Sequence, residues 1–150
     1  MKAIIVHGGA GNIKSEKRRE EVPVRIEIVK ESASKGYSIL RNGGSAIDAA
    51  VAAVKVLEDN PVFNAGKGSQ LNEEGEVEMD AGIMDGSSLS IGAVADIKRI
   101  KNPIELARVI MEKSPHNFLI GESAEEFGKK FGIEFVPSYY FYTERLIQIF

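Results

Sequence analysis

Cysteine is absent from the sequence, and other residues that could act as nucleophiles or metal ligands are scarce. Without cysteine the chain can form no disulfide bond, no thiolate metal site and no cysteine nucleophile. The histidines, His7 and His116, do not have the H-x-x-x-H spacing of a metal-binding helix. No serine lies in a G-x-S-x-G motif; the nearest resemblance is at Ser69, where Lys67 occupies the first glycine position. A self-contained Ser-His-Asp active site is therefore not expected.

Long apolar runs are missing as well. The first run covers only residues 3–6, whereas a secretory signal needs an apolar stretch of about 7–15 residues. No segment approaches the roughly 20 apolar residues of a membrane-spanning helix. We therefore expect a soluble, cytoplasmic protein with no membrane partner.

The charge balance argues against a nucleic-acid partner. The formal net charge is −3, whereas proteins that bind nucleic acid present clustered lysine and arginine. The chain has 150 residues, of which 43% are hydrophobic, so it can bury a core. This length suits one compact domain or one half of a larger domain.

Hydrophobic periodicity and capping residues divide the chain into helices and strands. Apolar residues at three- and four-residue spacing over residues 24–40 predict an amphipathic helix, which ends at Asn42-Gly43-Gly44. Ser45 and Asp48 form a capping box before an alanine-rich helix over residues 46–58, whose small side chains permit close packing. The other predicted elements are a buried first strand (3–6), a loop (60–68), two strands (76–84 and 88–97) joined by a hairpin turn at Asp85-Gly86, a helix with Asn102 as its cap and Pro103 at its first position, and a short helix (123–131).

The order of these elements predicts an α+β fold. Strands joined by a hairpin, with helices before and after them, are typical of α+β layering rather than of alternating βαβ units. About three strands make a thin sheet, near the minimum for independent stability. We therefore expect another polypeptide to supply further strands.

A glycine-rich segment follows the predicted first strand. Successive glycines in His7-Gly8-Gly9-Ala10-Gly11 let backbone N–H groups point into a pocket, where they could hold an oxyanion or a phosphate. A tight strand-to-loop turn explains the same residues equally well. The segment lacks the spacing of the dinucleotide-binding fingerprint and of the P-loop.

Three further polar residues have both a chemical and a structural interpretation. Asp80 and Asp85 could bind a cation or perform acid–base chemistry. We favour the interpretation in which Asp85 makes the turn and Asp80 accepts a hydrogen bond from nearby backbone. Asn64, in a constrained glycine loop, could orient a substrate or fix the conformation of the loop itself.

Motifs in several segments resemble, in the same order, those of the plant-type asparaginases and isoaspartyl peptidases. These proteins are N-terminal-nucleophile amidohydrolases. The resemblance extends from about residue 4 to residue 131 and fades after Gly132. The segments that carry it are 7–11, 43–50, 57–69, 78–86, 92–95, 102–104, 114–116 and 119–121.

The resemblance implies a four-layer αββα sandwich built from a precursor that cuts itself. Residues 1–150 would be the α subunit, with residues 133–150 as a variable tail leading to the processing linker. Cleavage frees a threonine that begins the β subunit and serves as nucleophile, with its own α-amino group as general base. Thr143, the single threonine here, does not match the cleavage motif. The resemblance therefore implies no catalytic residue in this chain, a β-subunit partner and an (αβ)2 assembly.

Within this chain the resemblance implies supporting roles. Asn64 matches an asparagine beside the nucleophile, and Gly8 and Gly9 match a loop whose conformation is tied to self-cleavage. A structural sodium ion is implied as well, since oxygen ligands suit a hard cation, but no catalytic cofactor is. The main-chain carbonyls that match the sodium loop belong to Leu57, Glu58, Asn60, Phe63, Ala65 and Lys67.

The implied activity is hydrolysis of L-asparagine or isoaspartyl peptides to aspartate and ammonia or an amine. The sequence does not rank these two substrates. One alternative is glycosylasparaginase-like chemistry on a glycosylated asparagine. Another, from a different class, is a stand-alone α+β module that binds a small anion at residues 7–11 and needs no partner. A third is an inactive paralogue that has lost its second half.

Overall fold

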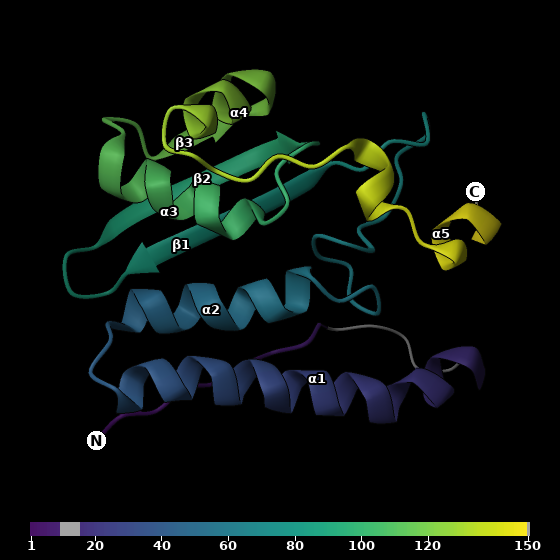
Figure 1. Cartoon of the computed structure of the whole chain (residues 1–150), viewed down its shortest axis with the longest axis horizontal. Coiled ribbons are helices and arrows are strands. Elements are labelled where there is room, and N and C mark those ends of the chain that lie inside the picture. The colour runs from purple at the N-terminus through teal and green to yellow at the C-terminus, as the bar shows by residue number, and fades with distance from the viewer. Residues whose placement is uncertain (10–15, 150) are drawn as a thin grey trace.

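The computed structural model describes residues 1–9 and 16–149. Two long helices, α1 (Glu16–Arg41) and α2 (Ala46–Glu58), lie side by side and form one layer of the molecule (Figure 1). The predicted capping box of α2 is confirmed. Ser45 Oγ accepts a hydrogen bond from the Asp48 N–H group (3.0 Å), and Asp48 Oδ2 accepts one from the Ser45 N–H group (3.2 Å).

Helix α1 is longer than the sequence predicts. It already includes Glu16 and contains Pro23, whereas the predicted helix begins at residue 24. The proline explains the difference, because proline inside a helical pattern normally marks a helix boundary. The end of the helix is predicted correctly, and the chain leaves it through Gly43 with φ of +90°.

Small residues let α1 and α2 approach closely. A β-carbon on Gly36 of α1 would lie 2.8 Å from the carbonyl oxygen of Ala49 in α2. Ser32 is fully buried, and its hydroxyl donates a hydrogen bond to the carbonyl of Ala53 (2.7 Å). The alanine-rich sequence of α2 therefore allows the close packing that the sequence analysis expects.

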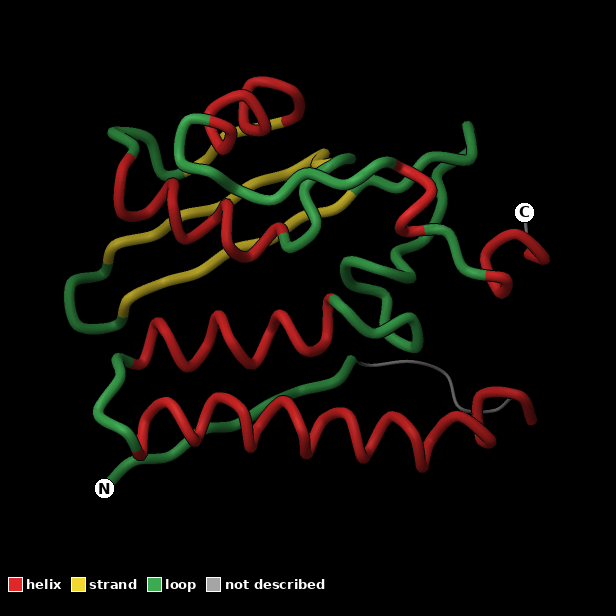
Figure 2. The backbone as a smooth tube through the Cα atoms, in the orientation of Figure 1, coloured by secondary structure: helices red, strands yellow, loops and turns green. Residues whose placement is uncertain are grey.

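The N-terminal segment, residues 1–9, runs alongside these helices but is not a strand (Figure 2). The predicted buried strand at residues 3–6 is therefore wrong. Ile4 and Val6 are partly buried, whereas Ile5 is 95% exposed. Backbone becomes a strand only when a neighbouring strand pairs with it. No other part of the described chain pairs with this segment.

The sheet contains β1 (Met79–Asp85), β2 (Ser90–Ile97) and β3 (Phe118–Ile120), in that spatial order. β1 and β2 form the predicted antiparallel hairpin, but their turn spans residues 86–89 instead of centring on Asp85-Gly86. β3 lies parallel to β2, and the sequence analysis does not predict it, because three residues are too few to show a period. The α+β class is confirmed.

Helices α3 (Pro103–Lys113) and α4 (Gly121–Lys129) cover one face of the sheet (Figure 1). α4 begins and ends two residues earlier than predicted. The backbone of α3 lies directly on β2, since a β-carbon on Gly92 would be 2.0 Å from the carbonyl oxygen of Ala107. The centre of the core consists of large side chains with no exposed surface: Ile97, Ile100, Leu106, Ile110 and Phe141.

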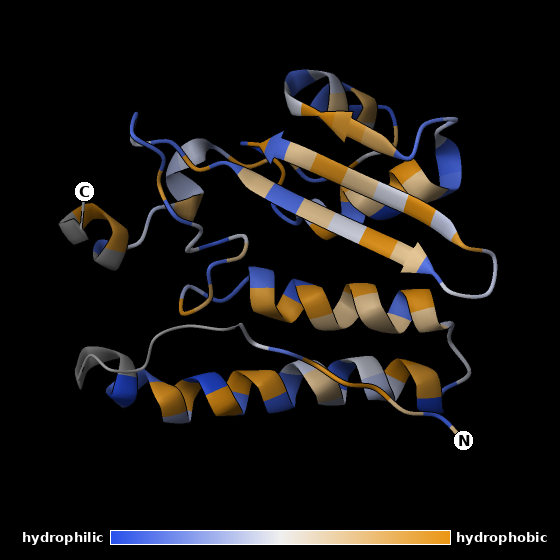
Figure 3. Cartoon of the chain, turned by 180° about the vertical axis from the view of Figure 1, so that it is seen from behind, coloured by the Kyte–Doolittle hydropathy of each residue, from blue (hydrophilic) through white to orange (hydrophobic). Residues whose placement is uncertain are grey.

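No helix of the described residues covers the opposite face of the sheet (Figure 3). The register places Met84, Ile91, Phe118 and Ile120 on this face, and their exposed fractions are 50%, 41%, 51% and 54%. Apolar side chains gathered on one surface are typical of an interface.

The chain ends in a 3-10 turn, η1 (Ser138–Phe141), and a short helix, α5 (Glu144–Ile149). Thr143 precedes α5, and its Oγ1 accepts a hydrogen bond from the Leu146 N–H group (3.3 Å), as an N-cap residue does. Among the described residues, none of the helices is both long and apolar enough to cross a membrane.

Candidate functional site

The loop after α2, residues 59–70, folds back onto the end of that helix. The Lys67 N–H group donates to the carbonyl of Glu58 (2.7 Å), and the Ser69 N–H group donates to the carbonyl of Gly66 (3.1 Å). Earlier in the loop, the Phe63 N–H group donates to the carbonyl of Asn60 (3.3 Å). These hydrogen bonds confirm the predicted loop at residues 60–68 and give it one defined shape. We call residues 57–69 the carbonyl loop.

Two glycines make this shape possible. Gly66 and Gly68 have φ of +56° and +112°, a region that residues with a β-carbon rarely adopt. A β-carbon on Gly66 would lie 2.4 Å from the carbonyl oxygen of Glu58. One on Gly68 would lie 2.6 Å from that of Pro61 and 2.8 Å from that of Phe63. The loop therefore crowds backbone carbonyl oxygens around positions that only glycine can occupy.

The carbonyl loop contains all the residues that the sequence analysis assigns to a cation: Leu57, Glu58, Asn60, Phe63, Ala65 and Lys67. The carbonyls of Leu57, Glu58 and Asn60 each accept a backbone hydrogen bond, whereas those of Phe63, Ala65 and Lys67 accept none from the described residues. Backbone carbonyl oxygens are suitable ligands for a hard monovalent or divalent cation. Within residues 1–9 and 16–149, no cluster of acidic, histidine or cysteine side chains could hold a metal.

Glu58 anchors the loop to the helix that covers the sheet. Its side chain is buried, and Oε1 accepts a hydrogen bond from the Ile104 N–H group at the start of α3 (3.1 Å). Its Oε2 is buried without a hydrogen-bond partner among the described residues. Burial raises the pKa of this carboxyl group to about 8, because desolvation disfavours the charged form.

The neighbouring residue makes a second link to α3. Asp59 Oδ1 accepts a hydrogen bond from the side-chain amide of Asn102 (3.0 Å). Asn102 occupies the predicted cap position, but its side chain makes no capping hydrogen bond. The acceptor for the first turn of α3 comes instead from Glu58, which is distant in sequence and could not be identified from local spacing.

We expect Glu58→Ala to destabilise the protein more than Glu58→Gln. Alanine leaves a cavity and removes the acceptor of the Ile104 N–H group, which we expect to lower the free energy of unfolding by about 2–3 kcal/mol. Glutamine retains both the volume and an acceptor oxygen, so we expect a change below about 1 kcal/mol. Chemical denaturation of the complete protein measures both variants, and equal losses would contradict the anchoring role.

Asn64 fixes the loop through its side chain. The residue is exposed, and its Oδ1 accepts a hydrogen bond from the Gln70 N–H group (2.8 Å). Its amide nitrogen makes no hydrogen bond to the described part of the chain. The side chain thus joins the two ends of this part of the loop, and its two N–H donors remain for a substrate or a partner chain.

Gly8 brings the N-terminal segment to the carbonyl loop. A β-carbon on Gly8 would lie 2.6 Å from Val29 Cγ2 and 3.0 Å from Phe63 Cε1, so Gly8 fits between α1 and the loop only because it has no side chain. Gly9 follows with φ of +103°. Ala10 and Gly11, the rest of the suggested anion-binding segment, lie outside the described residues.

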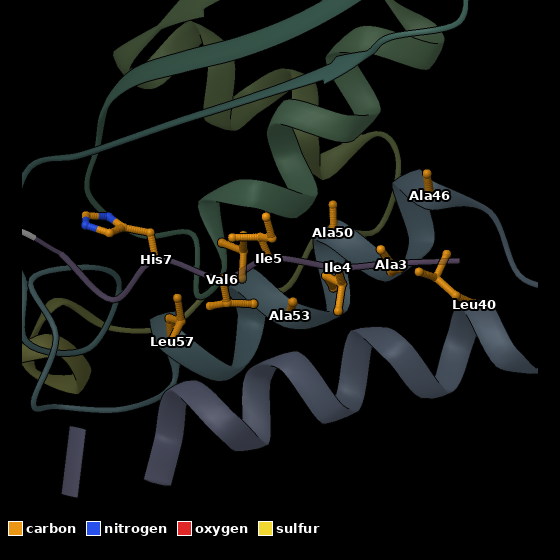
Figure 4. Close-up of a pocket in the computed structure, with 12 residues that line it drawn as sticks. Ala3, Ile4, Ile5, Val6, His7, Leu40, Ala46, Ala50, Ala53 and Leu57 are labelled. Carbon is orange, nitrogen blue, oxygen red and sulfur yellow. The ribbon is translucent and has the colours of Figure 1, made fainter. Parts of the chain in front are cut away.

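An apolar groove of about 220 Å³ lies between the N-terminal segment and α2. Figure 4 shows Ile5, Val6, Ala50 and Leu57 along it. His7 lies at one end and is exposed. The groove contains no nucleophile, so its chemistry suits burial of apolar side chains rather than a reaction.

The two aspartates of the hairpin have structural roles. Asp85 Oδ1 accepts hydrogen bonds from the Ser87 N–H group (2.8 Å) and hydroxyl group (2.7 Å), and these lower the pKa of Asp85. Asp80 Oδ1 accepts a hydrogen bond from the Asp96 N–H group (3.1 Å). The favoured interpretation of both residues is confirmed. In the described part of the chain, no serine or threonine hydroxyl makes a hydrogen bond to a histidine ring, although Ser114 Oγ accepts one from the main-chain N–H group of His116 (3.0 Å).

Comparison with known proteins gives consistent matches. Residues 1–150 match the model of a family described as asparaginase. The chain is 53% identical over 148 residues to a plant-type L-asparaginase of Pyrococcus horikoshii, and the match covers 99% of this chain and 46% of that protein. It is 51% identical over 137 residues to an isoaspartyl peptidase/L-asparaginase of Danio rerio, covering 91% of this chain and 43% of that protein. It is 50% identical over 142 residues to the Homo sapiens protein of the same name, and the match covers 95% of this chain and 45% of that protein.

The chain therefore spans less than half the length of these curated relatives. Its own residues supply a shaped carbonyl loop, an asparagine with unused donors and a glycine contact, but no pair of nucleophile and base within the described residues.

Proposed function

The chain belongs to the asparaginase family, and from this premise we propose that it is the N-terminal part of an amidohydrolase that acts on L-asparagine or isoaspartyl peptides. The products would be aspartate and ammonia or an amine. The family match over residues 1–150 carries the proposal. The carbonyl loop, Asn64 and the Gly8 contact support it, because they are positioning features that lack a nucleophile of their own.

The proposed enzyme has two subunits that arise from one precursor by self-cleavage. This chain would be the α subunit, and the β subunit would begin with a threonine. The threonine hydroxyl attacks the amide carbonyl while its α-amino group takes the proton. Ammonia or an amine leaves, and water then hydrolyses the threonine ester to release aspartate.

In this proposal the chain positions the threonine rather than reacting. Asn64 presents its amide N–H groups toward the nucleophile, and Gly8 and Gly9 shape the adjoining backbone. Holding reacting groups in a productive geometry contributes strongly to rate, and small displacements are costly. The hydrogen bond of Asn64 to Gln70 supports the assignment, because it fixes the direction of the amide group.

We further propose that the chain is half of a four-layer αββα sandwich that the β subunit completes. The uncovered apolar face of the sheet supports this arrangement. The extended N-terminal segment, which lacks a pairing strand among the described residues, and the groove beside it support it too. An (αβ)2 assembly belongs to the same proposal.

A structural sodium ion in the carbonyl loop is the remaining part of the proposal. The residues fit such an ion, because three carbonyls of the loop accept no hydrogen bond from described residues. When bound, the ion would hold the loop in one conformation and take no part in the chemical step.

We expect removal of sodium to loosen the carbonyl loop. The amides of Lys67 and Ser69 should exchange hydrogen about tenfold faster in tetramethylammonium chloride than in sodium chloride at equal ionic strength. The amide of Ala49, hydrogen-bonded to the Ser45 carbonyl in α2, is the internal control. Hydrogen-exchange mass spectrometry of the complete protein measures all three. Equal exchange of the loop amides in both salts would contradict a sodium site here.

The test of the proposed activity is release of ammonia or amine by the complete protein. L-Asparagine, a β-aspartyl dipeptide and a glycosylated asparagine should be compared by their kcat/KM values. Turnover of either of the first two supports the proposal. Activity on the glycosylated substrate alone would favour the glycosylasparaginase alternative, and activity on none would contradict the assignment.

A further inference from the structure

The last part of the chain is held against the body of the molecule. We define the strap as residues 134–146, drawn in yellow-green to yellow in Figure 1. The Val136 N–H group donates to the carbonyl of Arg99 (2.8 Å), and the Lys101 N–H group donates to the carbonyl of Glu134 (3.1 Å). The start of the strap is therefore fixed to the segment that follows β2.

Aromatic residues of the strap contact the carbonyl loop and the turn after it. Phe141 is fully buried in the core, and the ring of Tyr140 packs edge-on against it at 5.2 Å between centroids. On the loop side, the Lys67 ammonium group lies 5.2 Å from the centroid of the Tyr140 ring, a cation–π distance. The Tyr142 hydroxyl group donates to the carbonyl of Gly75 (3.3 Å).

Next to this contact the strap and the loop are separated. A cavity of about 390 Å³ lies between Pro61 and Val62 of the loop and Tyr142 and Thr143 of the strap. Lys67 lines the same cavity and also reaches Tyr140. The Lys67–Tyr140 contact therefore joins the two segments at the edge of this cavity.

We propose that Tyr140 is a positioning residue for the carbonyl loop. Phe141 fixes the ring of Tyr140, the ring holds the side chain of Lys67, and this restrains the Lys67 main chain. That main chain contributes both a carbonyl with no hydrogen bond from described residues and the N–H group bonded to Glu58. The strap up to residue 146 then belongs to the folded α subunit rather than to a flexible linker. Only the effect of Tyr140 on cation binding rests on the proposed function.

The test compares Tyr140→Leu with Tyr140→Phe in the complete protein. Leucine removes the cation–π contact, and we expect the amides of Lys67 and Ser69 to exchange about fivefold faster and the apparent sodium dissociation constant to rise by a similar factor. Phenylalanine keeps the ring and should restore both values. Tyr139→Leu is the matched control, because Tyr139 is 73% exposed. Lys67→Met removes the charge from the other side while keeping the main-chain carbonyl, and it should reproduce the Tyr140→Leu result.

The outcomes separate this inference from the proposed function. Faster loop exchange in Tyr140→Leu and Lys67→Met, but not in Tyr140→Phe, supports the positioning role even if sodium has no effect on the unaltered protein. If sodium protects the loop and these variants exchange like the unaltered protein, the positioning role is wrong while the cation site stands. If Tyr140→Leu does not fold, the Lys67→Met variant alone tests the positioning role. Unchanged hydrogen exchange of the loop amides in Lys67→Met would then overturn the inference.

Discussion

The Asn64→Ala enzyme is expected to hydrolyse its amide substrate with a kcat/KM about 100-fold below that of the unaltered enzyme. Alanine removes the N–H donors that the proposal directs at the nucleophile. It also removes the acceptor of the Gln70 N–H group, so the loop loses one fixed hydrogen bond. The residue is exposed, and we expect its replacement to lower the free energy of unfolding by only about 1 kcal/mol. Steady-state kinetics and chemical denaturation measure the two effects separately.

Asn64→Asp distinguishes the two roles of this side chain. Aspartate has the same shape and still accepts a hydrogen bond from the Gln70 N–H group, but it cannot donate. If the donors act on the nucleophile, this variant should lose activity as Asn64→Ala does, with the loop intact. Full activity in Asn64→Asp would show that Asn64 has only a structural role. Full activity in Asn64→Ala would show that Asn64 has no role in activity.

Gly68→Ala is expected to disrupt the carbonyl loop and to lower the free energy of unfolding by about 3 kcal/mol. The added β-carbon would lie 2.6 Å and 2.8 Å from the carbonyl oxygens of Pro61 and Phe63, and backbone oxygens cannot move aside without changing the loop. The φ of +112° adds further strain for any residue other than glycine. Because Phe63 is among the proposed cation ligands, the protection of the loop by sodium should disappear as well.

Gly86→Ala is the matched control for this variant. Gly86 lies in the turn between β1 and β2, and a β-carbon there would meet no atom within 4 Å. We expect little change in stability and full protection of the loop by sodium. Equal stability of Gly68→Ala and Gly86→Ala would show that the loop tolerates a different conformation, which would contradict a fixed arrangement of its carbonyls.

Local signals in the sequence identify the elements that local interactions determine. The capping box of Ser45 and Asp48 closes within four residues, and α2 has the predicted bounds. Asp85 likewise makes its turn with Ser87, two positions further along the chain. Such elements can be read from the chain because the partners of each hydrogen bond are close in sequence.

Interactions between distant residues account for the differences. The segment at residues 3–6 has the composition of a strand, but a strand also needs a pairing partner, and that partner is not among the described residues. Asn102 is at a cap position, yet its side-chain amide donates a hydrogen bond to Asp59. The acceptor for the Ile104 N–H group at the start of α3 is the side chain of Glu58 instead. β3 exists because α3 returns the chain to the edge of β2, which its three residues alone do not indicate.

The same contrast between local and distant interactions applies to the candidate site. Glycines at positions 66 and 68 mark a constrained loop in the sequence, and the structure shows which carbonyl oxygens they accommodate. The contacts of Gly8 with Phe63 and of Tyr140 with Lys67 join residues 55 and 73 positions apart in the sequence. No pattern within one chain predicts such contacts. The assignment of substrate and nucleophile came from resemblance to a family, because the reacting groups are not expected in this chain.

The most direct test of the central claim is intact mass spectrometry of the protein purified from its complete reading frame. Under denaturing conditions we expect two polypeptides, of which the second begins with threonine. Under native conditions we expect them to remain together, with two copies of each. A single polypeptide that stays uncut, or the present chain alone as a folded monomer, would contradict the two-subunit amidohydrolase and would favour a stand-alone binding module.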